Sequence, residues 1–103
     1  MRIALLSSTD LRWAVQLAVT WTEQGDDVTL VLLDGASAAV RQGHEDAPIL
    51  SEAIRMGCAV LAHTDALRRR AIGADRRIDG VKAVDLDEVA DLVTEGADKV
   101  VWL

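Results

Sequence analysis

Five short apolar runs alternate along this chain with longer segments in which apolar residues recur at helical spacing, and this alternation narrows the possible folds more than any other feature. The apolar runs occupy residues 2–7, 27–35, 58–63, 81–84 and 98–103. A continuous apolar run is typical of a strand that is covered on both faces, and strands that alternate with helices favour a parallel sheet with right-handed crossovers. We therefore predict a small doubly wound, flavodoxin-like α/β fold, with a five-stranded parallel sheet and helices on both faces.

The segments between these runs carry the start and stop signals of helices. The predicted helical segments are 8–25, 36–43, 44–57, 64–73 and 85–96. Ser8 or Thr9 is available to cap the first of them. The last is the clearest, because Asp85 and Glu88 have the spacing of a capping box and Gly96 follows the apolar face.

The size and composition of the chain indicate one domain, spanning residues 1–103. Half of the residues are hydrophobic, but there is no Phe or Tyr, so Val, Leu, Ile and Ala must fill the core. Seventeen acidic residues against eleven basic ones leave a net charge of -6. This balance opposes a general attraction to nucleic acid or to an anionic membrane.

The single cysteine excludes an internal disulfide and a CxxC metal or redox motif, and it suits a reducing compartment. The apolar residues near the amino terminus are too few for a signal-peptide core or a membrane span. We expect a soluble, cytoplasmic protein that does not act at a membrane.

Cys58 and His63 lie at the two ends of one predicted strand. Five steps along a strand separate their α-carbons by about 16 Å, and an odd step directs the two side chains to opposite faces. They therefore cannot form a catalytic pair within one chain. We interpret Cys58 as a small packed residue, with a thiol activated by nearby arginines or by another subunit as the alternative.

Polar residues follow the first and third apolar runs, as "SSTD" and "HTD". If the first and third strands flank the switch point of the sheet, as in the flavodoxin-like order, Ser8 and Thr9 face His63, Thr64 and Asp65 across one crevice. Such a crevice would suit an anion or a small nucleotide. The chain has no glycine-rich fingerprint and no aromatic residue in a loop to stack on a flavin, so we predict no cofactor.

Two further groups of charged residues are candidates for a metal site or for a contact with an anion. His44, Glu45 and Asp46 are adjacent in sequence, which gives poor metal geometry, so we predict no metal site. The arginines at 68–70 and 76–77 form a basic island, but consecutive helical residues point in three directions and do not form one cradle. They either pair with acidic neighbours or contact an anion or acidic partner.

Three motifs together resemble the DsrE/DsrF/DsrH sulfur-relay family: "VLLDGA" at 31–36, "MGCAVLAHTDALRRRAIG" at 56–73 and the terminal "DKVVWL". Members of that family typically show a hydrophobic strand that ends in Asp-Gly and a third strand that leads to a helix ending in Arg-Gly. Their last strand ends in Trp. The resemblance covers the chain from Ile3 to Trp102.

In the sulfur-carrying members a cysteine stands just after the third strand, about seven positions before the Arg of Arg-Gly. Counting back from Arg70, that position holds His63 here, and Ala71 replaces the usual glycine. The chain is therefore more similar to the DsrH or TusB type, whose subunits assist a partner that bears the cysteine. The candidate site residues are Ser8, Thr9, Asp34, Gly35, His63, Thr64, Asp65 and Arg70, with Cys58 as the alternative sulfur carrier.

The resemblance implies a non-catalytic subunit of a sulfurtransferase-type system, which works in tRNA thiolation, in sulfur oxidation or with another acceptor. It also implies a homomeric or mixed trimer or hexamer with related subunits, and contact with sulfur donor and acceptor proteins, tRNA being reached only indirectly. Two other functions remain open at this point. One is a persulfide carrier that uses Cys58, and the other is a small nucleotide- or anion-binding module.

Overall fold

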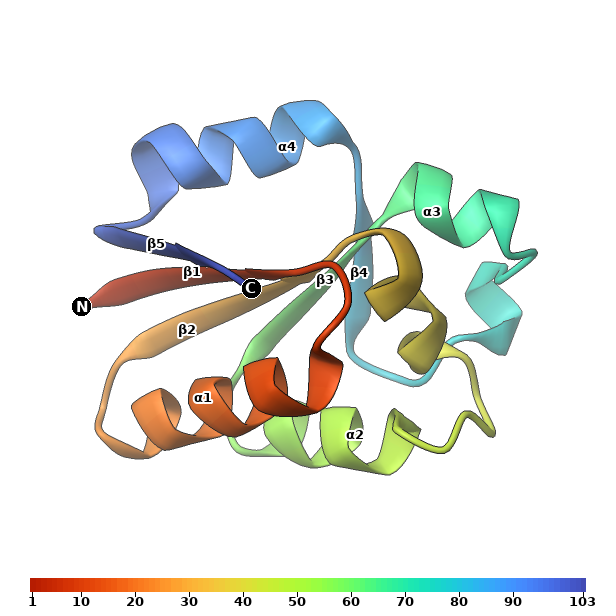
Figure 1. Cartoon of the computed structure of the whole chain (residues 1–103), viewed down its shortest axis with the longest axis horizontal. Helices are drawn as coiled ribbons and strands as arrows, with labels where there is room; N and C mark the ends of the chain where they lie inside the picture. The colour runs from red at the N-terminus through yellow and green to blue at the C-terminus, as the bar shows by residue number, and fades with distance from the viewer.

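A five-stranded parallel sheet forms the centre of the computed structural model, which describes residues 1–103 (Figure 1). The strands are β1 (Arg2–Ser7), β2 (Asp27–Leu32), β3 (Ala59–His63), β4 (Val81–Val84) and β5 (Lys99–Trp102). The helices are α1 (Leu11–Glu23), α2 (Ala47–Arg55), α3 (Thr64–Arg69) and α4 (Leu86–Asp91), with 3-10 turns η1 (Asp34–Val40) and η2 (Ala74–Arg76) and a π-helical turn η3 (Leu92–Gly96). The predicted α/β class is confirmed.

The strands lie in the order β4-β3-β2-β1-β5, and every neighbouring pair is parallel. This order differs from the flavodoxin-like order 2-1-3-4-5, in which β1 and β3 are neighbours. Here the chain adds β2, β3 and β4 one after another on the same side of β1, and only β5 returns to the other side. Because β2 separates β1 from β3, the predicted crevice between "SSTD" and "HTD" does not form.

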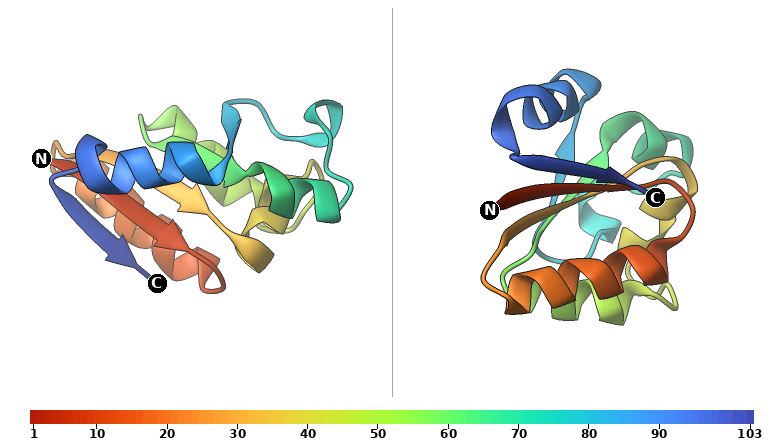
Figure 2. Two further views of the ribbon diagram at one scale, coloured as in Figure 1. Left: turned by 90° about the horizontal axis from the view of Figure 1, so that it is seen from above. Right: turned by 60° about the vertical axis from the view of Figure 1, so that its left-hand side comes forward.

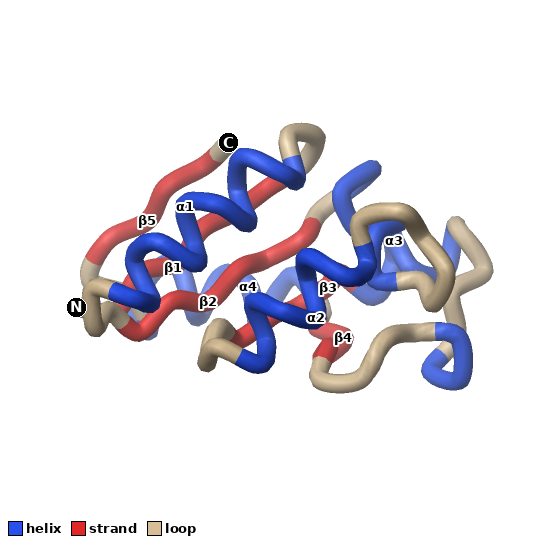
Figure 3. The backbone as a smooth tube through the Cα atoms, turned by 90° about the horizontal axis from the view of Figure 1, so that it is seen from below, coloured by secondary structure: helices blue, strands red, loops and turns tan.

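Helices cover both faces of the sheet, as the sequence predicts. Figures 1 and 2 show α1 and α2 on one face and α4 on the other. From below, α1 and α2 lie side by side over the sheet (Figure 3). Alternate residues of each strand point to opposite faces, so Leu5 joins the large core beneath α1 and α2. Leu6 joins a smaller core with Val89 of α4.

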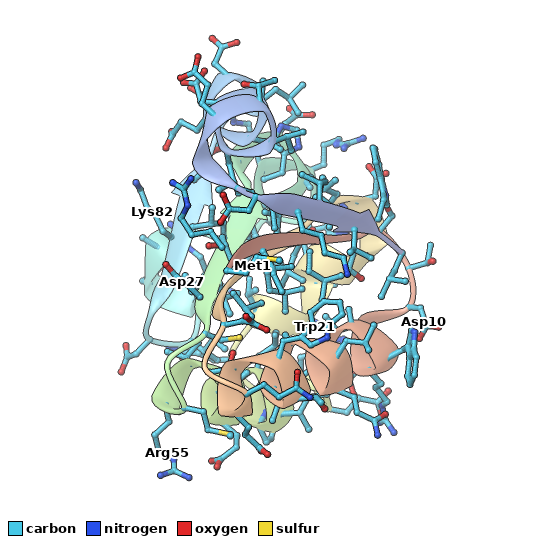
Figure 4. All side chains as sticks on the ribbon, turned by 90° about the vertical axis from the view of Figure 1, so that its left-hand side faces the viewer. Met1, Asp10, Trp21, Asp27, Arg55 and Lys82 are labelled. Carbon is cyan, nitrogen blue, oxygen red and sulfur yellow. The ribbon has the colours of Figure 1, made fainter.

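The edge strand β5 is fixed to β1 at its beginning. The backbone N–H of Arg2 donates to Asp98 Oδ2 at 2.9 Å, and the N–H of Asp98 donates to the Arg2 carbonyl at 2.8 Å. These contacts with Arg2 hold the pKa of Asp98 below its ordinary value. Further along β5, Lys99 Nζ lies 5.5 Å from the centre of the Trp21 ring. Trp21 belongs to α1, which runs beside this edge of the sheet (Figure 4).

The two predicted helix caps have different outcomes. Asp85 caps α4, because its Oδ1 accepts a hydrogen bond from the Glu88 backbone N–H at 2.8 Å. The prediction that Ser8 or Thr9 caps α1 is wrong: the N-cap residue is Asp10, and its side chain makes no capping bond. Ser8 lies two residues before the N-cap and instead accepts a hydrogen bond from Trp102. None of the helices combines the length and the apolar character that crossing a membrane requires.

We predict that Asp85→Ala lowers the free energy of unfolding by about 1 kcal/mol, since it removes the side chain that satisfies the first turn of α4. Asp85→Asn should retain most of the stability, because an asparagine oxygen accepts the same hydrogen bond. Urea denaturation of the three proteins measures the difference. Equal losses for the two variants would show that the charge of Asp85, and not its capping bond, supports the helix.

Candidate functional site

The carboxyl ends of β1 and β2 form one continuous surface. The Leu33 N–H donates to the Ser7 carbonyl at 2.9 Å, and the Ala36 N–H donates to the Ser8 carbonyl at 3.0 Å. Gly35 lies against the Ser8 backbone, since a Cβ atom there would make ordinary van der Waals contact with the Ser8 carbonyl oxygen, at 3.6 Å. The structure therefore brings together the predicted site residues Ser8 and Gly35, although through β2 rather than across a crevice.

Arg69 joins the carboxylates that follow β2 and β3. Its Nη2 lies 3.7 Å from Asp34 Oδ1, and its Nε lies 3.4 Å from Asp65 Oδ2. All three side chains are more than half exposed, so each ion pair contributes less than about 1 kcal/mol to folding. We name Asp34, Asp65 and Arg69, with the neighbouring His63, the carboxyl-edge cluster. It presents both signs of charge to solvent at one end of the sheet.

The backbone of Asp34 is itself unusual within this cluster. Its φ of 44° lies in the left-handed region, which aspartate tolerates better than most residues. The Ser37 hydroxyl donates to the Asp34 carbonyl at 2.6 Å and so secures the turn into η1. This conformation directs the chain from β2 toward α3 and places the Asp34 carboxylate within reach of Arg69.

His63 ends β3 and is the N-cap residue of α3. Its side chain is half-buried, and the imidazole has no hydrogen-bond partner or ion pair within the protein. The predicted partner, Asp65, is paired with Arg69 and Arg68 instead. Alternation along β3 gives His63 the same sheet face as Leu61, which packs in the core beneath α4. Both ring nitrogens are therefore available to a group outside this chain.

Three of the predicted site residues do not join the cluster through their side chains. The Thr64 hydroxyl donates to the Val84 carbonyl at 2.9 Å and so ties α3 to β4. Arg70 Nη1 donates to the Ala66 carbonyl at 3.1 Å, which turns that side chain back along its own helix. Thr9 is exposed, and only its backbone carbonyl is used, by the Leu11 N–H.

Arg69, predicted only as a member of the basic island at 68–70, takes the place expected for Arg70, and its pairing with acidic neighbours is one of the two roles predicted for that island. The signal that identifies it is its spacing: it follows Asp65 by four residues, and this places the two side chains on the same face of α3.

Cys58 lies at the opposite end of the sheet from this cluster. Its side chain is only 4% exposed, and its Sγ lies 3.3 Å from the Thr22 hydroxyl. Burial raises the pKa of the thiol, and the hydrogen bond with Thr22 partly offsets the increase. A higher pKa leaves less thiolate at neutral pH, and thiolate is the reactive form. The predicted separation of Cys58 from His63 is confirmed, and the two cannot act as a pair.

Comparison with protein-family models and with curated proteins found no match for this chain. The structure nevertheless resembles solved structures along its whole length. The ychN protein from E. coli superposes with a TM-score of 0.91 at 23% identity, covering 100% of this chain and 99% of the other. It has a DsrE-like fold, and at this identity the likeness shows the fold alone.

Two other solved structures share this fold. MTH1491 from Methanobacterium thermoautotrophicum, a protein of unknown function, superposes with a TM-score of 0.80 at 18% identity and covers 99% of this chain and 98% of its own. BT1422 from Bacteroides thetaiotaomicron, a conserved protein of unknown function, superposes with a TM-score of 0.81 at 13% identity. The match covers 99% of this chain and 94% of that protein.

Ala71 occupies the position after Arg70 at which the family motif has glycine. Its φ is 56°, in the left-handed region that glycine adopts freely and that costs a residue with a Cβ atom about 1 kcal/mol. Ala71 therefore adopts a backbone conformation that favours glycine.

We predict that Ala71→Gly increases the free energy of unfolding by about 0.5 kcal/mol, because relief of the Cβ clash exceeds the entropy that glycine adds to the unfolded chain. Ala74→Gly, in the next turn and without a positive φ, should decrease it. Thermal and urea unfolding of both variants measure the two signs. A loss of stability in Ala71→Gly would contradict the assignment of strain to this residue.

Proposed function

We propose that this chain is an assisting, non-catalytic subunit of a sulfur-relay system, of the type represented by DsrH and TusB. The observation that carries the proposal is the placement of His63 and Cys58 at opposite ends of one strand. The position where sulfur-carrying members of the family have a cysteine holds His63, half-buried at the carboxyl end of β3. The only thiol of the chain is buried at the other edge.

The carboxyl-edge cluster is suited to help a cysteine that another subunit provides. In persulfide transfer the acceptor thiolate attacks the outer sulfur of the donor persulfide, the donor S–S bond breaks, and the donor thiolate leaves, so no oxidant is needed. Arg69 would stabilise a thiolate at this edge, as a nearby cation lowers a thiol's pKa. His63, when protonated, would give a proton to the leaving thiolate.

A subunit that assists in this way requires a surface for its partner. The edge strand β5 leaves Val100 and Trp102 exposed, and Trp102 reaches the candidate site directly, because its Nε1 donates to Ser8 Oγ at 3.3 Å. Large exposed apolar side chains are typical of surfaces that pack against another subunit. This supports an oligomer with related chains, homomeric or mixed, that covers β5 and the neighbouring carboxyl edge.

The two alternative functions have less support in the geometry. A carrier role for Cys58 would require a buried thiol with a raised pKa to meet a second protein. The nucleotide- or anion-binding module was predicted for a crevice that the strand order does not form.

We predict that the wild-type chain gains no sulfur when it is incubated with a cysteine desulfurase and cysteine, as measured by intact mass. The double variant His63→Cys, Cys58→Ser should gain one sulfur atom, because it places a thiol at the carboxyl end of β3, the position used by the family's carriers. Cys58→Ser alone serves as the matched protein without a thiol, and a known persulfide carrier shows that the donor is active. Gain of sulfur by the wild type but not by Cys58→Ser would make Cys58 the carrier and would overturn the proposal.

We also predict that the wild-type chain accelerates sulfur transfer to a cysteine-bearing DsrE-type partner several-fold. His63→Ala and Arg69→Gln should each remove most of this acceleration, whereas Arg55→Gln, on the far helix α2, should leave it unchanged. Single-turnover transfer followed by intact mass measures the rates. Full acceleration by the His63→Ala and Arg69→Gln variants would show that the cluster takes no part.

A further inference from the structure

A pocket of about 360 Å³ is lined by residues of α3, of the segment 71–77 and of β4. Arg68 lines it, whereas the next residue, Arg69, points to Asp34. The volume of the pocket is within the range of small-molecule sites, about 300–1,000 Å³. We propose that this pocket binds a small ligand that carries an anionic group, a carboxylate or a phosphate, on an apolar body. The inference concerns a site outside the carboxyl-edge cluster and does not rest on the proposed function.

The inner part of the pocket is apolar. Leu67 and Ile72 line it and are almost completely buried, at 3% and 4% exposure, so they are fixed in the large core. Ala83 of β4 adds a small side chain to the lining. The exposed Ala71 and the half-buried Ala83 supply the apolar surface that a bound ligand would remove from solvent, beside a floor that Leu67 and Ile72 fix in the core.

The charged lining of the pocket is entirely positive. Arg68 of α3 and Arg77 after η2 line it, and no acidic residue does, although the chain as a whole carries a net charge of -6. Arg77 forms no ion pair, and Arg68 has only Asp65, which it shares with Arg69, so a ligand with an anionic group would neutralise charge that the protein balances only in part. A cationic or neutral ligand would not.

Both guanidinium groups retain free donors. Arg77 Nε donates to the Gly73 carbonyl at 3.4 Å, and Arg68 Nη1 lies 3.9 Å from Asp65 Oδ1. The other oxygen of that carboxylate, Oδ2, lies closer to Arg69, at 3.4 Å from its Nε. These contacts are long, and each guanidinium has five N–H groups. Carboxylates and phosphates accept paired N–H donors from this planar group.

The orientation of the ligand follows from the remaining polar group. Thr64 donates its hydroxyl proton to the Val84 carbonyl, so it offers the pocket only lone pairs. An ionised carboxylate cannot use them. The anionic group therefore belongs between Arg68 and Arg77, and the apolar body belongs against Leu67 and Ile72.

A neighbouring pocket provides the contrast that specifies the ligand. It has a volume of about 220 Å³ and is lined by Arg41, Gln42 and Arg76, without any hydrophobic residue. It offers charge but no apolar wall. Arg76 is adjacent to Arg77 in sequence and does not line the proposed site, which makes it the matched control.

The test is an NMR titration of the ¹⁵N-labelled full chain with hexanoate and with phenyl phosphate, compared with hexanol and inorganic phosphate. We expect the two amphiphilic anions to shift the amides of Leu67, Ile72, Gly73 and Ala83 and to bind at least tenfold more tightly than hexanol or inorganic phosphate. Binding by only one of the two would identify the anionic group that the site selects. No saturable shift with either, or equal binding of hexanol or inorganic phosphate, would overturn the proposal.

The variants separate this pocket from general attraction to arginine. Arg77→Gln should weaken the binding of the preferred anion at least fivefold, whereas Arg76→Gln should leave it within twofold of wild type. Both residues belong to the segment 71–77, and the NMR spectrum of each variant shows directly whether it is folded. Equal weakening by the two substitutions, or shifts that map to Gln42 rather than to Ile72, would show nonspecific attraction and would overturn the assignment.

Discussion

The parallel pairing of β1 with β2 on one side and β5 on the other is the interaction on which the rest of the structure depends. It joins residues 2–7 to 27–32 and to 99–102, and it fixes which strand ends are neighbours. Because β2 lies beside β1, the Asp34 turn is held against the Ser8 backbone. Because β3 follows β2, α3 begins where Arg69 can reach Asp34. The carboxyl-edge cluster is therefore a consequence of strand order.

Most elements of the fold could be predicted from the sequence, but their order in the sheet could not. The run at 2–7 coincides with β1, a covered strand that reads as a continuous apolar segment, and the run at 81–84 coincides with β4, an edge strand in which only Val84 is buried. None of the five runs, whether it is as apolar as 58–63 or carries charges as 98–103 does, records which strand lies beside it. The strand order is decided by packing between distant residues, which a local pattern does not contain.

In the candidate site, too, features set by residue spacing could be predicted from the sequence, whereas contacts between residues far apart in the chain could not. The placement of Cys58 and His63 at opposite strand ends follows from strand geometry alone, and the capping role of Asp85 follows from its spacing to Glu88. The contact between Trp102 and Ser8 joins residues 94 positions apart in the chain, and nothing near either residue predicts it. Local spacing was thus sufficient to exclude a catalytic pair of Cys58 and His63. It was not sufficient to predict which distant residues meet at the carboxyl ends of the strands.

The three consecutive arginines of α3 show how neighbouring identical residues acquire different surroundings. Successive residues of a helix point about 100° apart. Arg68 accordingly lines the apolar pocket, Arg69 bridges Asp34 and Asp65, and Arg70 turns back to the carbonyl of its own helix. One short helix therefore contributes a cation to each proposed site. Asp65, which pairs with both Arg68 and Arg69, is the residue that links them electrostatically.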